Sequence, residues 1–448
     1  MAENRTSGSE RDDTALAKRV ELHLHTRMSA MDSVVKIQEL FSILKRWGHD
    51  AVAVTDHGVV QAIPEFHEQA VKHGIKPIFG LEGQVYNDRA VEPSLPDGLE
   101  PARAVDTKYR LAFHISMLAM NRAGLKNLYR LVSLSHTDHY HRGPKIPKSV
   151  LLNHREGLLL GTSCISGELS MAYFAEASYE EMKEIAALYD YIEIMPLDAF
   201  ITGSDEGSIS RENLKKMYKL FYRLGKDLDI PAVMTGDVHF IHPEDAIYRS
   251  VLNALQDYQP SNIQLGIHLR TTDEMLEAAM EIFEDSKIAE EITVHNTRML
   301  AERVEVFDPF ESQSKIEDIG DIEEAIKGMS TSDAYGYLEE RFGKGRVFRA
   351  SKIVTLGPGR AYGYVRTYME KMNKGYSLEE IWKIVAKIRH VKRRTDLHPT
   401  AFLIVPEDRE VHDFTPVQLS RASAKNPLMM THLPAKALED SCIIVKKR

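Results

Sequence analysis

The sequence has very little cysteine and no long apolar run. Its 448 residues include only two cysteines, Cys164 and Cys442, which excludes a disulfide framework and favours a reducing, cytoplasmic setting. No apolar run reaches the roughly 18 residues that a membrane-spanning helix needs, so no membrane partner is expected. Residues 1–18 are polar and mixed in charge, unlike a signal peptide, and are expected to form a disordered tail.

The charge balance also excludes one class of function. The chain is 43% hydrophobic and 27% charged, which is ordinary for a globular protein, and its length allows one large domain and a smaller one. The formal net charge is −9, so the molecule as a whole does not attract polyanions. Any contact with nucleic acid must therefore come from local basic patches.

Strand-like and helix-like segments alternate between residues 19 and 305. Short apolar runs are typical of buried strands, and amphipathic stretches between most of them are typical of helices. This α/β alternation predicts a parallel sheet, most economically closed into a barrel. The expected strands are Val20–Leu24, Ala51–Thr55, Ile75–Leu81, Leu111–Met120, Gly157–Gly161, Tyr191–Met195 and Ala232–Thr235. The expected helices include Ser33–Trp47, Ala62–His73, Tyr179–Leu188 and Ser210–Leu228.

Other stretches break this rhythm. Residues 87–108 and 136–148 are rich in turn-forming or charged residues and are expected to be loops. The acidic stretch 306–329 is expected to be a linker, followed by a smaller α+β unit at 330–448. Within that unit the basic stretch 383–394 suits phosphate contacts, but a solvated helix face is an equally good interpretation.

Side chains that bind metals follow or lie within the expected strands. His23 and His25 are two residues apart, so both point to the same side of a strand, and His57 follows the next strand. Active sites of α/β barrels are assembled at strand ends. Imidazoles, carboxylates and one thiol together suit Zn²⁺, Mn²⁺ or Fe²⁺ better than Mg²⁺ or Ca²⁺, and the number of donors would serve two or three ions. The candidate metal ligands are His23, His25, Asp32, His57, Glu82, His114, Cys164, Asp237 and His239.

Each part of this pattern is weak when taken alone. A lone His-x-His pair is more often structural than catalytic, and a buried thiol such as Cys164 usually serves as a small hydrophobic side chain. Asp56 is expected to be a cap or a partner of a ligand. The metal site is predicted from the ordered set at the ends of successive strands.

The loop at 136–148 contains a second group of histidines and cations. Its histidines are expected to be ordinary loop residues. A solvated basic loop is the favoured interpretation of its cations, and the alternative is a contact to a substrate phosphate. The candidate phosphate contacts are Arg142, Lys145 and Lys148 in this loop, and Lys392, Arg393 and Arg394 in the basic stretch near the C-terminus.

Six motifs resemble the PHP (polymerase and histidinol phosphatase) family, and within it the PHP domain of PolC-type DNA polymerase III alpha subunits. They are Arg19–Asp32, Trp47–His57, His73–Glu82, Asn127–His136, Ile146–Ser149 and Thr235–His239. The resemblance covers roughly residues 19–305 and implies a distorted (βα)₇ barrel with up to three metal ions. It also implies that the candidate metal ligands above are the family's ligand positions, with none lost.

The second unit resembles the part of PolC that follows its catalytic aspartates. The matching segments are Phe342–Ala350, Ala361–Val365, Val391–Pro399, Ile404–Pro406, Val411–Gln418 and Thr431–His432. The proofreading exonuclease and the front half of the polymerase palm are missing from the pattern. Asp321 and Glu323 match the paired catalytic aspartates only weakly, and Lys446 stands where the third carboxylate would fall. A cation there would repel Mg²⁺, so the chain is expected not to be a working polymerase.

The resemblance and the candidate ligands favour a metal-dependent phosphoesterase, of phosphatase or 3′-exonuclease type, that uses a metal-activated hydroxide. Glu82 would bridge two ions, and Asp32 and Asp237 would complete the catalytic group, one of them helping to move a proton. The substrate would be a phosphate ester or nucleic acid in DNA replication or repair, with DNA or a replicase subunit as possible partner. The alternative is a non-catalytic replication-associated structural or binding protein, whose metal only stabilises the barrel.

Overall fold

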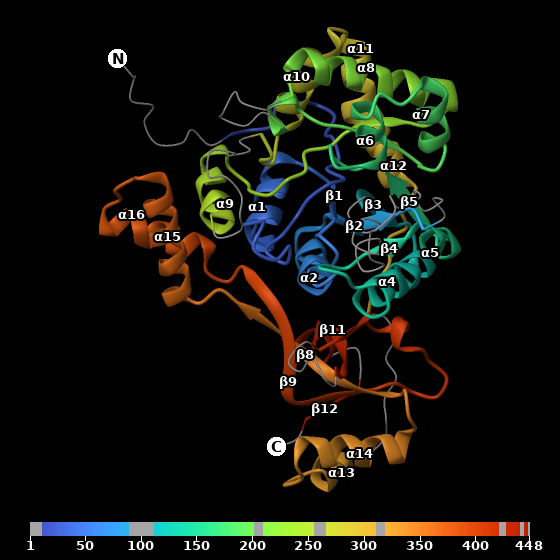
Figure 1. Cartoon of the computed structure of the whole chain (residues 1–448), viewed down its shortest axis with the longest axis vertical. Coiled ribbons are helices and arrows are strands. Elements are labelled where there is room, and N and C mark those ends of the chain that lie inside the picture. Colours follow the sequence, from blue (N-terminus) through green and yellow to red (C-terminus); the bar gives the residue numbers. More distant parts are fainter. Residues whose placement is uncertain are drawn as a thin grey trace, which may run out of the picture.

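The computed structural model describes residues 11–88, 112–200, 209–254, 266–310, 319–420, 427–439 and 443–446, and shows a mixed α/β protein (Figure 1). The strands are β1 (Ala51–Val54), β2 (Lys76–Tyr86), β3 (Phe113–Ala119), β4 (Ile146–Pro147), β5 (Leu158–Gly161), β6 (Ile192–Ile194), β7 (Ala232–Met234), β8 (Val347–Thr355), β9 (Lys392–Ile404), β10 (Val417–Leu419), β11 (Met429–Pro434) and β12 (Ile443–Lys446). The helices of the first unit are α1 (Ile37–Trp47), α2 (Ile63–His73), α4 (Arg122–His136), α5 (Lys148–Asn153), α6 (Glu168–Phe174), α7 (Tyr179–Ala186), α8 (Arg211–Leu228), α9 (Ala246–Asn253), α10 (Thr272–Phe283), α11 (Ser286–Glu290) and α12 (Asn296–Glu302). Those of the second unit are α13 (Ile319–Ala325), α14 (Thr331–Phe342), α15 (Pro358–Met372), α16 (Leu378–Ile388) and α17 (Ala435–Leu438). No helix in these ranges has both the length and the apolar character needed to cross a bilayer.

Strand pairings in the first unit return to their starting point. β1 pairs with β2, β2 with β3, β3 with β5, and β6 with β7. Isolated bridges complete the circuit by joining Glu21 to Val52, Gly161 to Tyr191 and Leu24 to Val238. Six of the seven expected strands are therefore named strands, and the first, at residues 20–24, takes part through single bridges.

One strand of this circuit contradicts the expected parallel arrangement. β3 is antiparallel to both β2 and β5, whereas the other pairings of the circuit are parallel. Parallel neighbours need a crossover connection that usually contains a helix. Because the sequence between β2 and β3 has no amphipathic helical pattern, it does not supply that crossover. The reversal brings the beginning of β3, near His114, to the side where the other strands end.

Helix α1 shows why the helices cover the strands. Its buried side chains include Ile37, Leu40, Leu44 and Trp47, at the three- and four-residue spacing that makes one apolar face. The helix ends at Gly48, which has a φ of 78° and donates its N–H to the last turn. The expected boundaries of α1, α2, α7 and α8 are met to within a few residues. In contrast to the expected loop at 136–148, His136 still belongs to α4 and Ile146–Pro147 forms β4.

The segment before the first strand is not a free tail over the part that is described. Arg11 donates hydrogen bonds to the carbonyls of Ile241 and Leu269, at 2.7 and 2.9 Å. Asp13 accepts from the backbone N–H of Thr272 at 2.6 Å, at the start of α10. The expectation of a disordered tail is therefore wrong for residues 11–18, because their polar groups have partners on the folded domain. The remainder of that expectation, at residues 1–10, lies outside the described residues.

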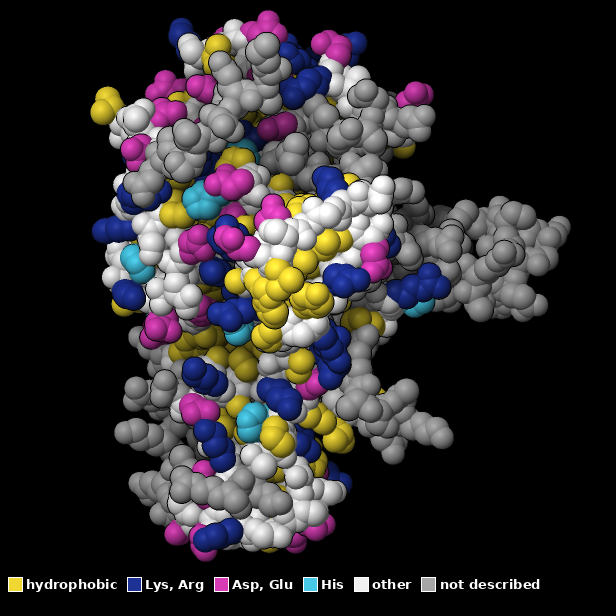
Figure 2. Space-filling model, turned by 90° about the vertical axis from the view of Figure 1, so that its left-hand side faces the viewer, with side chains coloured by type: hydrophobic (Ala, Val, Ile, Leu, Met, Phe, Trp, Pro, Cys, Tyr) yellow, Lys and Arg dark blue, Asp and Glu magenta, His cyan; other side chains and the backbone are white. Residues whose placement is uncertain are grey.

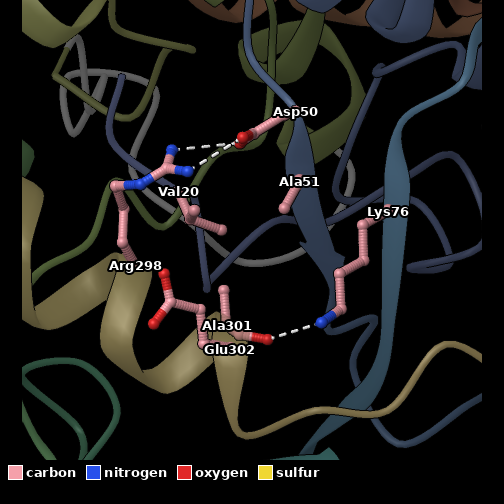
Figure 3. A pocket seen from close by; sticks show the side chains of 7 residues that line it. All are labelled: Val20, Asp50, Ala51, Lys76, Arg298, Ala301 and Glu302. Carbon is pink, nitrogen blue, oxygen red and sulfur yellow. Dashed lines mark hydrogen bonds and ion pairs between the residues drawn. The ribbon is translucent and has the colours of Figure 1, made fainter. Parts of the chain in front are cut away.

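The other end of the strand circuit is closed by paired polar groups (Figure 3). A pocket of about 130 Å³ lies where residues 20, 51 and 76 begin their strands. Lys76 donates to the carbonyl of Ala301 at 2.8 Å, and Arg298 pairs with Asp50 at 2.9 Å. These contacts engage Lys76, Arg298 and Asp50 within the protein, so this end of the strand circuit has a structural role.

The second unit contains a sheet in the order β10-β11-β8-β9-β12. Helix α13 lies inside the stretch expected to be a linker, so that expectation is wrong for residues 319–325. Ile322 and Ile326 are fully buried in a cluster with Leu338 and Phe402 of the second unit. The hairpin of α15 and α16 reaches α9 of the first unit and shares its apolar core (Figure 1). The two units are therefore in direct contact.

A close backbone approach at Gly124 gives a test of this packing. A Cβ atom at Gly124 in α4 would lie 1.9 Å from the carbonyl oxygen of Gly157, before β5. Gly124→Ala is therefore expected to lower the free energy of unfolding by about 2–3 kcal/mol. The matched control is Gly336→Ala in α14, where nothing lies within 4 Å, and it should raise stability by up to about 1 kcal/mol. Urea unfolding of both variants measures this, and equal effects would contradict the packing.

Candidate metal centre

All of the candidate metal ligands meet at the side where the parallel strands of the circuit end. The first strand segment, the turn after it, β1, β2, β3, β5 and β7 each supply at least one of them. Ligand atoms fall within 4.8 Å of one another in three overlapping groups. The groups are His25, His57 and His239; His23, His25 and Asp237; and His57, Glu82 and His114.

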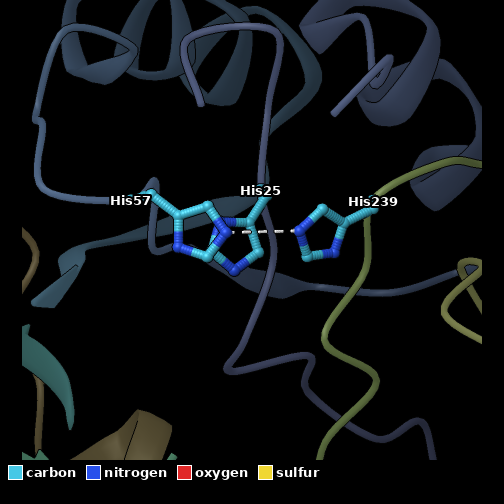
Figure 4. A group of neighbouring side chains, drawn as sticks. All are labelled: His25, His57 and His239. Atoms are coloured by element: carbon cyan, nitrogen blue, oxygen red, sulfur yellow. Dashed lines mark hydrogen bonds between the residues drawn. The ribbon is translucent and has the colours of Figure 1, made fainter. Parts of the chain in front are cut away.

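The group of three imidazoles is shown in Figure 4, with the rings turned toward one another. The ring centroid of His25 lies 4.0 Å from that of His57 and 4.3 Å from that of His239. The Nε2 atoms of His57 and His239 are 3.5 Å apart. The three imidazoles come from separate segments of the chain. Their nitrogens are close enough together to bind one metal ion.

Glu82 joins the third group to the others. Its Oε1 lies 2.9 Å from Nδ1 of His114 and accepts a hydrogen bond from Ser163 at 2.7 Å. Its Oε2 faces Nδ1 of His57. The Sγ atom of Cys164 lies 3.5 Å from Nδ1 of His114, so the thiol also belongs to this group. A carboxylate with one oxygen toward each of two imidazoles is suited to bridge two ions.

Asp237 joins the second group to the imidazoles. Its Oδ1 lies 3.3 Å from Nε2 of His25 and 3.5 Å from Nε2 of His23. Its φ of 46° is in the left-handed region, where a residue other than glycine is held only by its surroundings. The backbone therefore holds this carboxylate against the histidines at a conformational cost.

Two carboxylate oxygens indicate that the group is arranged for cations. Oε2 of Glu82 and Oδ1 of Asp237 are buried, and neither has a hydrogen-bond partner among the described residues; the groups that face them are imidazoles of the same centre. Buried polar atoms almost always have such a partner or bind an ion. The donor set therefore fits divalent ions by its chemistry as well as by its spacing.

Asp32 lies at the more open side of the centre. Its Oδ2 is 2.9 Å from Nε2 of His57 and 3.1 Å from Nε2 of His239. Arg249 contacts the other oxygen at 2.7 and 3.0 Å. Burial raises the pKa of Asp32, but the charges of Arg249 and His239 lower it more, and the pKa is held well below its usual value. Asp32 is therefore ionised and oriented at neutral pH.

The histidines differ in their protonation. Burial lowers the pKa of His25, the charges of His57 and His239 lower it further, and His25 is neutral at pH 7. Burial also lowers the pKa of His57, but Glu82 and Asp32 outweigh it and raise the pKa to about 10. Only a neutral imidazole nitrogen binds a metal. We therefore expect proton release from His57 when ions bind.

A known family matches the part of the chain that carries most of the candidate ligands. Residues 21–200 match the PHP domain family. The chain contains a PHP domain. Asp237 and His239 lie beyond the matched residues, yet they converge on the same centre as the ligands within it. The family match therefore does not extend to two of the candidate ligands.

The chain is also related to PolC-type DNA polymerases. It is 26% identical to the DNA polymerase III PolC-type of Thermotoga petrophila, over 97% of this chain and 56% of that protein. For the corresponding protein of Clostridium perfringens the identity is 22%, over 96% of this chain and 52% of that protein. The chain thus spans a little over half the length of these relatives.

Two solved structures have weak overall similarity. One is a two-domain protein from Bacteroides vulgatus described as containing a predicted PHP-like metal-dependent phosphoesterase; it has 15% identity and a TM-score of 0.27, and covers 53% of this chain and 57% of that one. The other is an amidohydrolase from Chromobacterium violaceum with bound sulfate; it has 14% identity and a TM-score of 0.27, and covers 49% of this chain and 87% of that one. Scores this low assign neither fold nor function.

The PHP domain also contains supporting residues that the sequence reasoning missed. Glu193 accepts from Nδ1 of His23 at 2.8 Å, and Ser29 contacts Nδ1 of His25 at 3.1 Å. Asp56 accepts from Ser29 at 2.7 Å, which agrees with its expected supporting role. Such contacts fix the ring orientation of a ligand. A glutamate inside the apolar run of β6 was a signal that could have identified Glu193.

The candidate phosphate contacts separate into two groups. Lys145 donates to Gln84, and Lys148 pairs with Glu168 at 2.7 Å, so these two cations are used inside the PHP domain. Arg142, at a φ of 53°, is also in contact with neighbouring residues. The residues at 392–394 instead begin β9 and line a cavity together with His57 of the metal centre. On the face shown in Figure 2, Lys and Arg are interspersed with Asp and Glu. This face therefore has no extended surface of positive charge alone.

Proposed function

We propose that the PHP domain is a metal-dependent phosphoesterase, of phosphatase or 3′-exonuclease type, linked to DNA replication or repair. The observation that carries the proposal is the set of three overlapping donor groups, in which two buried carboxylate oxygens have no hydrogen bond to a described residue and face only imidazoles of the groups. Two or three ions of Zn²⁺, Mn²⁺ or Fe²⁺ suit these nitrogen, oxygen and sulfur donors. When bound, such ions activate water and neutralise charge on a phosphoryl group. The strand circuit that carries the donors fits the distorted (βα)₇ barrel that the resemblance implies.

The side chains of the centre would have different roles in this reaction. Glu82 would bridge, because its two oxygens face different histidines. Asp237 would complete the inner part of the centre, where His23 and His25 are fully buried. Asp32 would orient the attacking water, because it lies on the open side and Arg249 fixes its other oxygen. His57 has a 34% exposed side chain, which marks the direction from which substrate would enter.

We also propose that the second unit no longer synthesises DNA. Asp321 and Glu323, the weak match to catalytic aspartates, belong to helix α13. Glu323 accepts from the backbone N–H of Lys446 at 3.1 Å, and the Lys446 ammonium pairs with Glu439 at 2.8 Å. A lysine at this place opposes the binding of Mg²⁺ that nucleotide transfer needs. We expect no incorporation of deoxynucleotides on a primed template.

The complete burial of His23 and His25 favours the second candidate function. Here the protein is a non-catalytic, replication-associated binding protein, and its metal ions only stabilise the fold. The partial exposure of His57 and Asp32 supports catalysis instead, since substrate needs access to the ions.

An assay with a matched histidine variant separates the two candidates. The full chain, loaded with Mn²⁺ or Zn²⁺, is tested on bis(p-nitrophenyl) phosphate and on 3′-labelled oligonucleotides. Turnover is expected for the wild type and for His73→Ala, whose residue lies at the end of α2 away from the centre. His25→Ala should lose both turnover and metal. Bound metal without turnover in any assay would reject the phosphoesterase and leave the binding protein.

A further inference from the structure

A cavity of about 300 Å³ connects the metal centre with the second unit. The PHP domain contributes His57 and Tyr140 to its lining, and the second unit contributes Lys392, Arg393 and Arg394. None of the described residues that line it carries a carboxylate. The cavity is therefore positively charged, and His57 of the metal centre is one of the residues that line it.

An irregularity in β9 places the three cations around the same cavity. In a regular strand, neighbouring side chains point to opposite faces. Here β8 and β9 pair through Val354 with Arg394 and through Thr355 with Lys392, so Arg393 is an extra residue between the two pairs. Such a bulge changes the direction of side chains and is common beside active sites.

Lys392 is the most informative of these cations. The residue is only 4% exposed, its side chain lines the cavity, and the opposite charge that acts on it is the Asp56 carboxylate. The nearby carboxylate of Asp56 is bonded instead to Thr26 and Ser29, at 2.6 to 2.8 Å. A buried cation is costly when the carboxylate near it is already hydrogen-bonded to other groups. By contrast, the exposed Arg394 is paired with Asp396 at 2.8 and 2.9 Å.

The backbone of Lys392 is fixed to the metal centre. Its N–H donates to the carbonyl of Arg27 at 3.0 Å, and its carbonyl accepts from the N–H of Met31 at 3.1 Å. Arg27 and Met31 belong to the turn between the donors His25 and Asp32. The second unit therefore holds this buried cation at a set position beside the ions' ligands.

We propose that the cavity binds the phosphodiester next to the scissile one in a nucleic-acid strand, with Lys392 as its main contact. The proposal rests on the proposed function, which places the scissile phosphodiester at the donors around His57. A simple phosphate monoester has no second phosphate for this cavity, whereas every internal linkage of a strand has one. The second unit would thus select polynucleotides over small phosphate esters.

Short oligothymidylates test this directly. The dinucleotide TpT has one phosphodiester and the trinucleotide TpTpT has two. With the Mn²⁺-loaded full chain, kcat/KM should be roughly tenfold to a hundredfold higher for TpTpT, mainly through KM, because a charge-assisted phosphate contact is gained. Lys392→Met should bring the ratio of kcat/KM for TpTpT to that for TpT close to one, and Lys392→Arg should keep most of the preference. The matched control is Lys352→Met, an exposed cation of β8 that does not line the cavity.

Binding measured without turnover separates this proposal from the proposed function. Calorimetric titration of chelator-treated full chain with TpTpT should show binding that weakens tenfold or more in Lys392→Met. The slope of log K against log salt should fall by about 0.7 in that variant, as expected for one lost phosphate contact with a single strand. Lys392-dependent binding without hydrolysis would reject only the phosphoesterase. Hydrolysis with no preference for TpTpT, or a preference unaffected by Lys392→Met, would overturn only the phosphate site.

Discussion

Glu82→Gln is expected to lower kcat/KM for phosphodiester hydrolysis by more than roughly a hundredfold, which is the upper end for residues that only support a metal ligand. The Glu82 carboxylate contacts His57, His114 and Ser163 and has one oxygen without a hydrogen-bond partner in the described chain. An amide keeps the shape but removes the negative charge that two ions would share. Steady-state kinetics and elemental analysis of the purified variant measure both effects.

The control for this prediction is another glutamate-to-glutamine change. Glu68 is exposed on α2, so Glu68→Gln should change neither the metal content nor kcat/KM. Urea unfolding checks that the Glu82 variant is folded. A folded Glu82→Gln protein with full metal content and full activity would show that Glu82 is not a ligand.

Removal of the ions is expected to destabilise the PHP domain strongly. An ion that binds only the folded state, at a concentration a thousand times its dissociation constant, adds about 4 kcal/mol to the free energy of unfolding. The donors come from positions 23 to 239 of the chain and meet only after folding. Chelation should therefore lower the temperature of thermal denaturation by several degrees or more, and added Zn²⁺ or Mn²⁺ should restore it.

The His25→Ala variant provides the control for the effect of metal on stability. His25 belongs to two of the three donor groups, so its loss should remove most of the shift caused by chelation. Mg²⁺ should restore less than Zn²⁺, because nitrogen and sulfur donors suit it poorly. An unchanged denaturation temperature after proven removal of bound ions would contradict a metal centre that stabilises the fold.

Much of the candidate site could be predicted because it depends on local pattern. His25, His57 and Asp237 each follow a short apolar run, and such runs become strands whose ends meet. Glu82 and Cys164 also follow apolar runs, and the structure brings both to the same place. That the group binds metal remains a prediction.

The missed features depend on contacts between distant parts of the chain. An apolar run has no direction, so the pattern could not show that β3 is antiparallel. Arg11 was interpreted as part of a free tail, because its partners Ile241 and Leu269 lie more than two hundred residues away. The burial of Lys392 depends in the same way on a turn of the other unit. Composition identifies a charged residue but does not show where it lies in the fold.

The two hydrogen bonds between β9 and the turn at residues 27–31 also constrain the evolution of this protein. A descendant that had stopped copying DNA would still need the start of β9, since its loss would release the turn that presents Asp32. Selection for hydrolysis would then preserve that part of a second unit that, as proposed, does not synthesise DNA. Deletion of the second unit is accordingly expected to harm the proposed hydrolysis, although all of its candidate metal ligands lie in the first unit.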